Sequence, residues 1–394
     1  MIKQKKLVPK RRFEGYTNNW EKQNLDNVLD LLKDGTHGTH KNVKDGIYLL
    51  SAKNIKNGKI NFDKSDRIIS IDEYRAIHRN FELKKGDVLL TVVGSIGESA
   101  ILNQENIFTF QRSVAYLRPK ELITSQYLFT TINSINFQNE LKDRQVVSAQ
   151  PGIYLGDLSV IPIYFPSLKE QQQIGQFFKH LDEMITLEQR KIDKTKALKS
   201  AYLAEMFPAE GERVPKRRFK GFTGEWEKHD LGELTKINTG ESDAQDSTVD
   251  GKYPFFVRSE NIQRSDRYTF DGEAILIPGE GRLGDIYHYF VGKFDYHQRV
   301  YKISDFAGEL DGKFTLYTMH KTFKKHALKN TVKATVDSLR LPVITEYELL
   351  LPTKKEQIKI ASLFTNLDNI ITTHEKKLAK LKATKQAYLH EMFV

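Results

Sequence analysis

Residues 166–207 read PSLKEQQQIGQFFKHLDEMITLEQRKIDKTKALKSAYLAEMF, and residues 352–393 read PTKKEQIKIASLFTNLDNIITTHEKKLAKLKATKQAYLHEMF. The two segments align without a gap, and 21 of the 42 positions are identical. Both end in the same signature, Ala-Tyr-Leu followed by Glu-Met-Phe. A repeat of this length means that the chain builds one piece of structure twice, so it decides the architecture.

Each copy carries the start and stop signals of one long helix. Ser167 and Glu170 have the spacing of a capping box, and so do Thr353 and Glu356. Pro208 ends the first helix. About 38 residues at a rise of ~1.5 Å give a helix roughly 57 Å long.

Apolar residues recur three or four positions apart in both copies, which is typical of a coiled coil. The two series contain Ile174, Phe178, Leu181, Ile185, Tyr202 and Met206, and Ile360, Phe364, Leu367, Ile371, Tyr388 and Met392. Because the seam is sustained over several heptads, we expect the two helices to pair with each other. The alternative is that each helix packs only on its own domain.

The orientation of the pair is not fixed by connectivity, because a whole domain lies between the two helices in the sequence. We expect an antiparallel pair, which relates the two halves of the chain by a pseudo-two-fold axis. The polar seam residues Glu188, Lys199, His374 and Lys385 would fix its register, with solvated seam defects as the alternative.

A second, shorter repeat precedes each variable region. Residues 8–25 and 214–231 are identical at 12 of 18 positions, and each copy contains one of the two tryptophans, Trp20 and Trp226. Between the repeats the halves diverge, although each insert is long enough to be a domain. A constant frame with two different inserts is typical of a frame that carries two specificities.

The sequence therefore predicts an α+β protein in which two α/β domains are separated by two long helices. We expect a first variable domain at 1–165, a central helix at 166–207, a second variable domain at 208–351 with a linker at 208–213, and a C-terminal helix at 352–394. β-branched and aromatic runs predict strands at 46–50, 87–93 and 274–277, and helices are expected near 125–141 and 315–329.

The composition allows binding to an anionic polymer. The chain has 61 Lys and Arg against 51 Asp and Glu, a net charge of +10 and a pI of about 9.2. It has no cysteine, which excludes disulfides and cysteine zinc sites. Residues 1–6 are basic with no apolar stretch behind them, and no run approaches the roughly 18 apolar residues of a membrane span, so we expect a cytoplasmic protein.

Basic, amide, hydroxyl and imidazole side chains in exposed-looking turns are candidates for DNA contacts, because such groups neutralise phosphates or read base edges. A solvated surface role is the alternative for each of them. The candidates are Thr36, His37, Thr39, His40, Lys53, Asn54, Ser95, Gln111 and Arg112 in the first insert, and Arg258, Ser259, Asn261, Arg282, His297, Gln298 and Arg299 in the second.

Patterns that would indicate catalysis are weak. Gly279, Gly281 and Gly284 match the dinucleotide fingerprint, but the following residues 285–291 are typical of a strand, where the fingerprint requires a helix. We therefore expect a hairpin turn or a phosphate approach there, as in the glycine turn at 94–97. His37 and His40 have no third ligand at metal-site spacing, so we expect no metal and no bound cofactor.

The arrangement resembles the specificity subunit of type I restriction–modification systems. The resemblance covers essentially the whole chain and is strongest at 166–171 and 352–357. It also includes passages of the first variable domain at 34–37, 53–55, 86–91 and 94–97, whereas the second domain lacks the Gly-Thr-His stretch.

This resemblance implies that each variable domain is a target-recognition domain for one half of a split, asymmetric DNA sequence. The paired helices would set the unspecified spacer and dock two methyltransferase subunits, which bring S-adenosylmethionine. Restriction subunits would join with ATP and Mg, and this chain would catalyse nothing. The alternatives are a nucleotide-dependent enzyme that uses residues 279–284, and an adaptor whose coiled coil assembles partners without sequence preference.

Overall fold

The computed structural model describes residues 7–103, 108–146, 151–330 and 338–394. The expectation about residues 1–6 lies outside this range. The chain divides into two compact units, Met1–Glu188 with Lys376–Val394, and Gln189–Glu375. Each unit thus takes the start of one long helix and the end of the other.

The two long helices are α5 (Leu168–Glu205) and α9 (Lys354–Glu391), each of 38 residues as predicted. Inside the first unit their segments run antiparallel, because Asp182 pairs with Lys385 over 2.6 Å and Glu188 pairs with Lys377 over 2.9 Å. From Asp182 to Glu188 the residue number rises along α5, while the number of the paired residue on α9 falls from 385 to 377. The predicted antiparallel orientation is confirmed.

The second unit repeats this pairing with its own segments of α5 and α9. Lys196 lies 2.7 Å from Glu375, and Lys199 lies 2.5 Å from Asp368. Lys199 and Asp368 are the repeat equivalents of Lys385 and Asp182, so the same ion pair occurs once in each unit. Three of the predicted polar seam residues, Glu188, Lys199 and Lys385, therefore join the two helices, and a register role for His374 stays a prediction.

The apolar seam packs on the domains as well as between the helices. Ile185, Tyr202 and Tyr388 are half-buried, and the other predicted seam residues are buried. The core of the first unit contains Ile174, Phe178 and Leu181 of α5 together with Leu389, Met392 and Phe393 at the end of the chain. In the second unit the equivalent set is Ile360, Phe364 and Leu367 with Met206 and Phe207. Each core is therefore completed by the end of the helix that begins in the other unit.

The shorter repeat holds each helix start by a buried ion pair. Arg12 donates through Nε and Nη2 to both oxygens of Glu170, over 2.6 and 2.7 Å, and Arg218 makes the equivalent bonds to Glu356 over 2.7 and 2.8 Å. The side chains of Glu170 and Glu356 are no more than 1% exposed. The capping-box interpretation of these two glutamates is thus corrected, because their carboxylates accept from an arginine of the shorter repeat.

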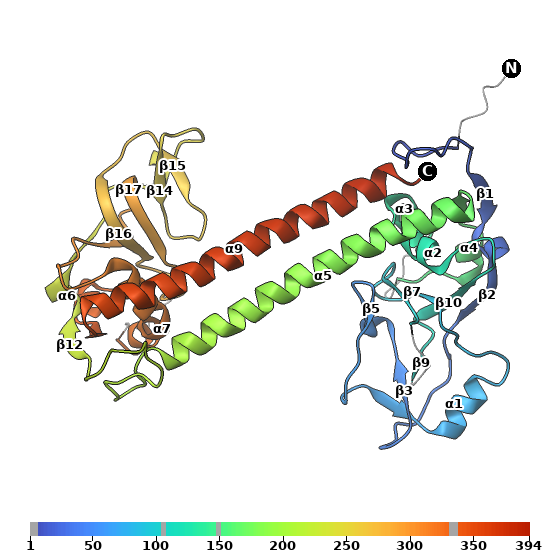
Figure 1. Cartoon of the computed structure of the whole chain (residues 1–394), viewed down its shortest axis with the longest axis horizontal. Coiled ribbons are helices and arrows are strands. Elements are labelled where there is room, and N and C mark those ends of the chain that lie inside the picture. The colour runs from blue at the N-terminus through green and yellow to red at the C-terminus, as the bar shows by residue number, and fades with distance from the viewer. Residues whose placement is uncertain (1–6, 104–107, 147–150, 331–337) are drawn as a thin grey trace. The chain divides into compact units, whose positions relative to one another are not determined.

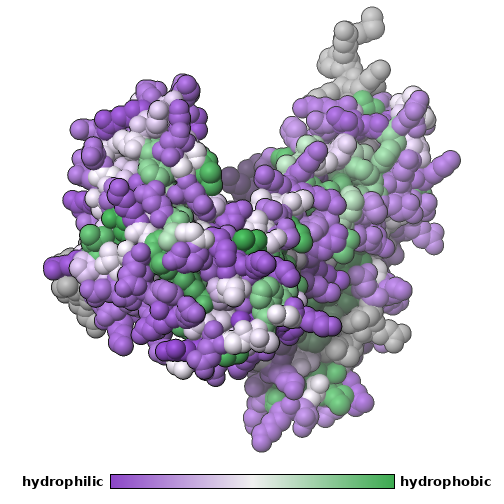
Figure 2. Space-filling view, turned by 60° about the vertical axis from the view of Figure 1, so that its left-hand side comes forward, coloured by the Kyte–Doolittle hydropathy of each residue, from purple (hydrophilic) through white to green (hydrophobic). Residues whose placement is uncertain are grey.

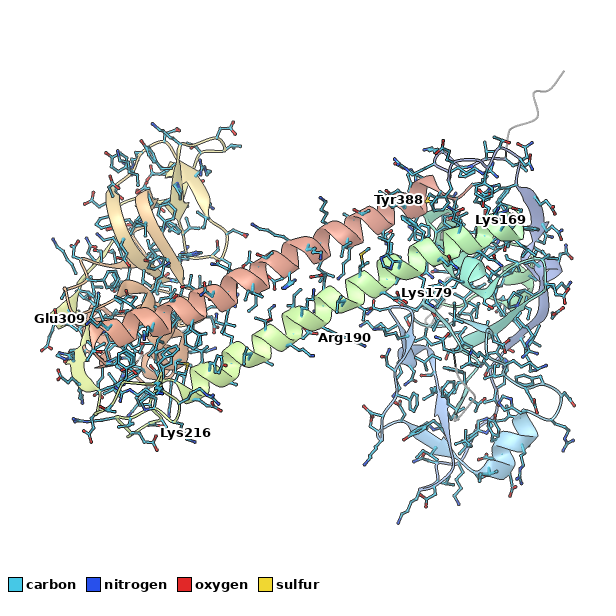
Figure 3. The ribbon with its side chains drawn as sticks, in the orientation of Figure 1. Lys169, Lys179, Arg190, Lys216, Glu309 and Tyr388 are labelled. Atoms are coloured by element: carbon cyan, nitrogen blue, oxygen red, sulfur yellow. The ribbon has the colours of Figure 1, made fainter. Side chains whose placement is uncertain are left out.

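The glutamine after each of these glutamates ties the helix to a loop of its domain. Gln171 accepts a hydrogen bond from Thr124 N over 3.0 Å and donates to the carbonyl oxygen of Leu122 over 2.9 Å. Gln357 accepts from Asp311 N and donates to Glu309 O, each over 2.9 Å; Figure 3 labels Glu309. The Glu-Gln pairs of the long repeat therefore attach the start of each long helix to its own domain.

The first domain contains two main sheets and a two-stranded ladder that directly precedes α5 (Figure 1). The ladder pairs β1 (Glu21–Asn24) with β11 (Pro162–Phe165), the last strand before α5. The four-stranded sheet has the order β2 (Leu29–Asp34), β10 (Val114–Pro119), β7 (Val88–Thr91) and β8 (Ser99–Ile101). The three-stranded sheet has the order β6 (Arg67–Ile69), β3 (Ile47–Leu50) and β9 (Phe108–Phe110). The short strands β4 (Ile55–Lys56) and β5 (Lys59–Ile60) form a hairpin.

The second domain joins the corresponding strands into one sheet. Its order is β13 (Lys236–Thr239), β18 (Val300–Ser304), β16 (Phe270–Pro278), β17 (His288–Tyr296), β14 (Tyr253–Phe256) and β15 (Gln263–Ser265). The ladder before α9 pairs β12 (Glu227–Asp230) with β19 (Glu348–Leu351), as β1 pairs with β11. Most side chains on the face of this unit seen in Figure 2 are hydrophilic.

Seven further α-helices belong to the two domains in the described part of the chain. They are α1 (Ile71–Ile77), α2 (Ser125–Ile132), α3 (Ile135–Asp143) and α4 (Leu155–Ser159), then α6 (Leu231–Leu234), α7 (Gly312–Asn330) and α8 (Leu341–Thr345). The strands predicted at 46–50, 87–93 and 274–277 and the helix near 315–329 are confirmed. The helix expected near 125–141 is two helices, because the side chain of Ser134 accepts from Phe137 N and starts a new one. No helix in the described part of the chain has the length and apolarity to cross a membrane.

Candidate nucleic-acid interface

In the first domain, four separate loops meet at the ends of strands β2, β3, β7 and β10. Thr36 bridges to Gln111, and the Gln111 N–H donates to Leu50 O over 2.8 Å. Ser113 accepts from Ala52 N over 3.0 Å through its side chain. A Cβ atom at Gly35 would collide with the carbonyl oxygen of Phe110, so this close approach requires glycine. The loops that carry Thr36, Lys53 and Arg112 are thereby brought together.

The two histidines of the first loop have different surroundings. His37 is largely exposed, and its Nε2 lies 2.5 Å from Asp34. His40 is mostly covered, with Nε2 2.8 Å from Thr36 Oγ1 and Nδ1 3.3 Å from Glu73 Oε1. The ring of His40 therefore orders the loop, whereas His37 and the neighbouring Thr39 present exposed side chains.

Lys53 and Asn54 follow β3 in a short turn. Asn54 is buried, and its amide nitrogen donates to Asn61 O over 2.9 Å and to Asp66 Oδ1 over 3.1 Å. Lys53 is exposed but lies 2.7 Å from the same Asp66, and this contact is the main reason why the pKa of Asp66 lies below its usual range. Asn54 thus shapes the turn, and a DNA contact by its side chain stays a prediction.

The second domain repeats several backbone contacts of this loop arrangement. His297 N donates to Phe256 O over 2.9 Å as Gln111 N does to Leu50 O, and Ser242 bridges to His297 as Thr36 does to Gln111. As letters, Gln111-Arg112 and Gln298-Arg299 look like equivalent pairs. The backbone instead aligns Gln111 with His297, which places Arg112 opposite Gln298 and Ser113 opposite Arg299.

The two glycine turns are also equivalent. Val92 N donates to Ser113 O over 2.9 Å, and Gly279 N donates to Arg299 O over 2.8 Å. Each turn has two glycines three residues apart with positive φ, with values of 83° and 95° at Gly94 and Gly97, and of 86° and 69° at Gly281 and Gly284. The exposed residues Ser95 and Arg282 hold the same place in these turns. Strand β17 follows the second turn, as expected, so the fingerprint lacks the helix that binds a pyrophosphate.

Side chains of the second domain form ion pairs on this scaffold. Arg258 and Arg299 both donate to Glu280, over 3.0 Å and over 2.7 to 2.8 Å, and the hydrogen bond from Arg299 is the main reason why the pKa of Glu280 lies below its usual range. Arg282 donates to Glu260 over 2.8 Å. Each of these three arginines is therefore bonded to a glutamate of the loops.

The remaining candidates of the second domain differ in exposure. Gln298 and Asn261 are exposed, and Ser259 is half-buried with its hydroxyl donating to Asn261 O over 3.0 Å. His297 is buried, and its Nδ1 accepts from Arg299 N over 3.0 Å, which leaves Nε2 facing Asp243 at 3.2 Å. A DNA contact by His297 therefore stays a prediction, while its structural role is to hold two loops.

A buried carboxylate that the sequence did not indicate supports the second domain. Asp295 is fully buried and accepts from the hydroxyls of Ser242, over 2.7 and 2.8 Å, and Thr269, over 2.9 Å. These bonds fix Ser242 beside His297. Its signal in the sequence is a lone acidic residue inside an aromatic strand, between Phe294 and Tyr296.

Within the described residues, no group of three or more His, Cys, Asp or Glu side chains is placed to hold a metal ion. The loops instead present exposed Thr39, Lys53, Ser95 and Arg112 in one domain and Arg258, Arg282 and Gln298 in the other. Hydrogen-bond donors and positive charges presented on loops are the groups that bind a polyanion such as DNA.

The sequence profile of the type I restriction modification DNA specificity domain matches this chain twice, at residues 17–197 and 223–383. The chain is 31% identical over 162 residues to the EcoDI specificity subunit of Escherichia coli, an alignment that covers 41% of this chain and 35% of that protein. A second alignment, to the EcoBI specificity subunit of Escherichia coli, is 24% identical and covers 48% of this chain and 42% of that protein. The chain thus matches less than half the length of these two relatives.

Two comparisons extend over nearly the whole chain. It is 23% identical to the putative MjaX specificity subunit of Methanocaldococcus jannaschii, over 94% of this chain and 92% of that protein. The crystal structure of the S subunit of a type I restriction–modification system from M. genitalium superposes with a TM-score of 0.69 at 17% identity, covering 98% of this chain and 99% of that one. At this identity the structural likeness shows a shared fold.

Proposed function

Because this chain belongs to the family of type I restriction–modification DNA specificity proteins, we propose that it reads a bipartite DNA target and catalyses no reaction itself. The observation that carries the proposal is one loop scaffold built twice with different side chains on it. Equivalent positions hold Ser95 and Arg282, Arg112 and Gln298, and Ser113 and Arg299. Two scaffolds with different donors suit two different half-sites.

Each domain reads one half-site through the loops described above. The exposed donors of the first domain contact one half, and those of the second domain contact the other. Arginine, glutamine and serine side chains supply both phosphate and base-edge contacts, so the interface combines positioning with readout.

The frame has a separate task, which is to dock the subunits that carry out the chemistry. Because the frame residues are repeated, equivalent surfaces occur in both units, as the ion pairs of Arg11 with Glu391 and of Arg217 with Glu205 illustrate. Two copies of one methyltransferase subunit therefore bind this cytoplasmic chain, and α5 and α9 set the spacer. These subunits supply S-adenosylmethionine, and restriction subunits add ATP and Mg.

The first test is to co-express this chain with its methyltransferase subunit and to map methyl-adenine across the host genome. The expected result is methylation at a split motif with a gap of constant length. A complex that forms but methylates no such motif would contradict the proposal and favour an adaptor. Nucleotide binding by the isolated chain in the absence of DNA would favour the enzyme alternative.

A second test exchanges one recognition domain. Residues 26–161, which end before strand β11, are replaced with the corresponding segment of another family member, and the reciprocal exchange replaces residues 232–347, which end before β19. Each exchange should change one half-site and leave the other half-site and the gap intact. A change in both half-sites would contradict the division of labour.

A further inference from the structure

Three positions of the loop scaffold differ together between the two domains. Leu50 of β3 pairs with Phe110, and Phe256 of β14 pairs with Tyr296, so Leu50 and Phe256 are equivalent. Ala52 and Arg258, each two residues further along the chain, are therefore equivalent as well. Backbone pairing also aligns Ser113 with Arg299.

The third position follows from matching bridges. Val93 bridges to Gly152 as Glu280 bridges to Ser338. In each case the preceding residue accepts a loop N–H through its carbonyl oxygen, Val92 from Ile153 over 2.9 Å and Gly279 from Leu339 over 2.8 Å. The positions that hold Ala, Val and Ser in the first domain therefore hold Arg258, Glu280 and Arg299 in the second.

In the second domain these three residues form one connected group. Glu280 accepts from Arg299 Nη1 through both oxygens, over 2.8 and 2.7 Å, and from Arg258 Nη1 over 3.0 Å. The side chain of Glu280 is 28% exposed, whereas those of Arg258 and Arg299 are 47% and 53% exposed. The carboxylate is thus the least exposed of the three groups and accepts from both arginines, so it supports their side chains.

We propose that Arg258, Glu280 and Arg299 are the base-reading element of the second domain, and that this element recognises a G·C base pair. The inference rests on the proposed function, and it adds which residues read the second half-site and what they read. Glu280 acts as a positioning residue for both arginines.

The chemistry of the group favours a base edge over a phosphate. A guanidinium has five N–H donors, so an arginine that bonds Glu280 through Nη1 keeps donors on Nη2 and Nε. Guanine offers two acceptors, O6 and N7, on its major-groove edge, and the paired cytosine offers an amino donor that suits a carboxylate. A carboxylate beside the arginines repels phosphate oxygens, so the triad as a whole fits G·C better than the DNA backbone.

Ion pairing also explains why two arginines can be held side by side. Without Glu280 their like charges would repel and the side chains would sample several rotamers. With Glu280 in its ionised form, which the two guanidinium groups favour by lowering its pKa, both arginines are bonded to one carboxylate and the net charge of the group is +1.

The experiment uses the complex with the methyltransferase subunit and a plasmid library in which both half-sites are randomised. Methylated sequences are compared for the wild type, Arg258→Ala, Arg299→Ala, Glu280→Gln and Glu280→Asp. In each arginine variant, preference for G·C at one position of the second half-site should fall roughly tenfold to a hundredfold. The first half-site should stay unchanged, because the domain proposed to read it is not altered.

The glutamate variants separate positioning from mere folding. Glu280→Gln should lose the same preference although both arginines remain, and it should bind non-specific DNA more tightly at low salt because a negative charge is removed. Glu280→Asp keeps the charge and should retain part of the preference. Complex formation and Trp226 fluorescence verify that each variant is folded.

Several results would overturn the inference while leaving the proposed function intact. One is a wild-type second half-site without a G·C pair. Another is an unchanged half-site in Arg258→Ala and Arg299→Ala, and a third is a uniform loss of affinity for all sequences, which would assign the arginines to phosphates. A wild-type complex without any bipartite motif would instead overturn the proposed function itself.

Discussion

Arg12 lies 2.6 Å from Glu170 through Nε, and the carboxylate that it holds is 1% exposed. A buried carboxylate left without its partner costs about 3–5 kcal/mol. We therefore expect Arg12→Ala to destabilise the first unit by that amount. The measurement is urea unfolding in a Trp226→Phe background, where Trp20 alone reports on the core of the first unit.

The neighbouring residue provides a matched control. Arg11 also pairs with a glutamate, Glu391, but its side chain is 55% exposed. Arg11→Ala should leave the unfolding midpoint nearly unchanged, because water solvates both groups once they part. Equal losses in the Arg11 and Arg12 variants would mean that burial does not distinguish the two pairs.

The register of the helix pair can be tested at Lys385 and Asp182, which lie 2.6 Å apart. Lys385→Glu places two like charges together and should lower the stability of the first unit by about 1 kcal/mol. The double variant Lys385→Glu with Asp182→Lys should restore it. Unfolding read by Trp226 in a Trp20→Phe background serves as the control, and a double variant as unstable as the single one would argue against direct pairing.

If the paired helices set the gap between half-sites, lengthening them should lengthen the gap. Seven residues inserted after Arg190 and seven after Lys377 add ~10 Å of helix while keeping the heptad phase, which corresponds to roughly three base pairs at ~3.4 Å each. Methylation mapping should show both half-sites unchanged and the gap extended.

The control for the insertion is a seven-residue Gly/Ser segment at Gly211, in the exposed loop between α5 and β12. This segment adds length outside the helices and should leave the gap as in the wild type. A wild-type gap in the helix variant as well would exclude the ruler.

Acid should weaken the first unit through His78. Its ring is buried, its Nε2 lies 2.8 Å from Thr109 Oγ1, and burial lowers its pKa below the ordinary value. Below pH ~6.5 His78 becomes protonated in the unfolded chain but stays neutral in the folded chain. The free energy of unfolding therefore falls from that pH down towards the folded-state pKa of His78.

His78→Gln removes this titration. Between pH 7 and pH 5 its unfolding free energy, read by Trp20, should change less than that of the wild type. A parallel pH dependence in both proteins would place the titrating group elsewhere.

The frame is visible in the sequence because its signals are local. Heptad spacing and identity between the two copies need no knowledge of distant contacts, and they placed α5 and α9 correctly. The role of Glu170 could not be found in this way, because its spacing to Ser167 fits a capping box while its partner Arg12 lies far away in the sequence. Spacing alone does not reveal which of two acceptable partners a carboxylate takes.

The loops are harder to predict, because matching residue types in the two domains suggest an alignment that the backbone does not follow. Gln111-Arg112 and Gln298-Arg299 look equivalent, yet backbone bonds shift the match by one residue and align Arg299 with Ser113. Exposure could not be predicted either: Asn54 and His297 look like reading residues and are buried by the turns they hold together. Residue type indicates which side chains are able to contact DNA, while the fold decides which of them reach the surface.

The exchange of helix ends between the units bears on how the protein is made. Leu389, Met392 and Phe393 complete the core around Trp20, but they leave the ribosome after the entire second domain has been synthesised. The N-terminal domain therefore keeps part of its apolar core uncovered until residues 389–393 have been synthesised. A polypeptide interrupted before residue 376 lacks the part of α9 that belongs to the first unit, so it leaves apolar surface of that core exposed to water.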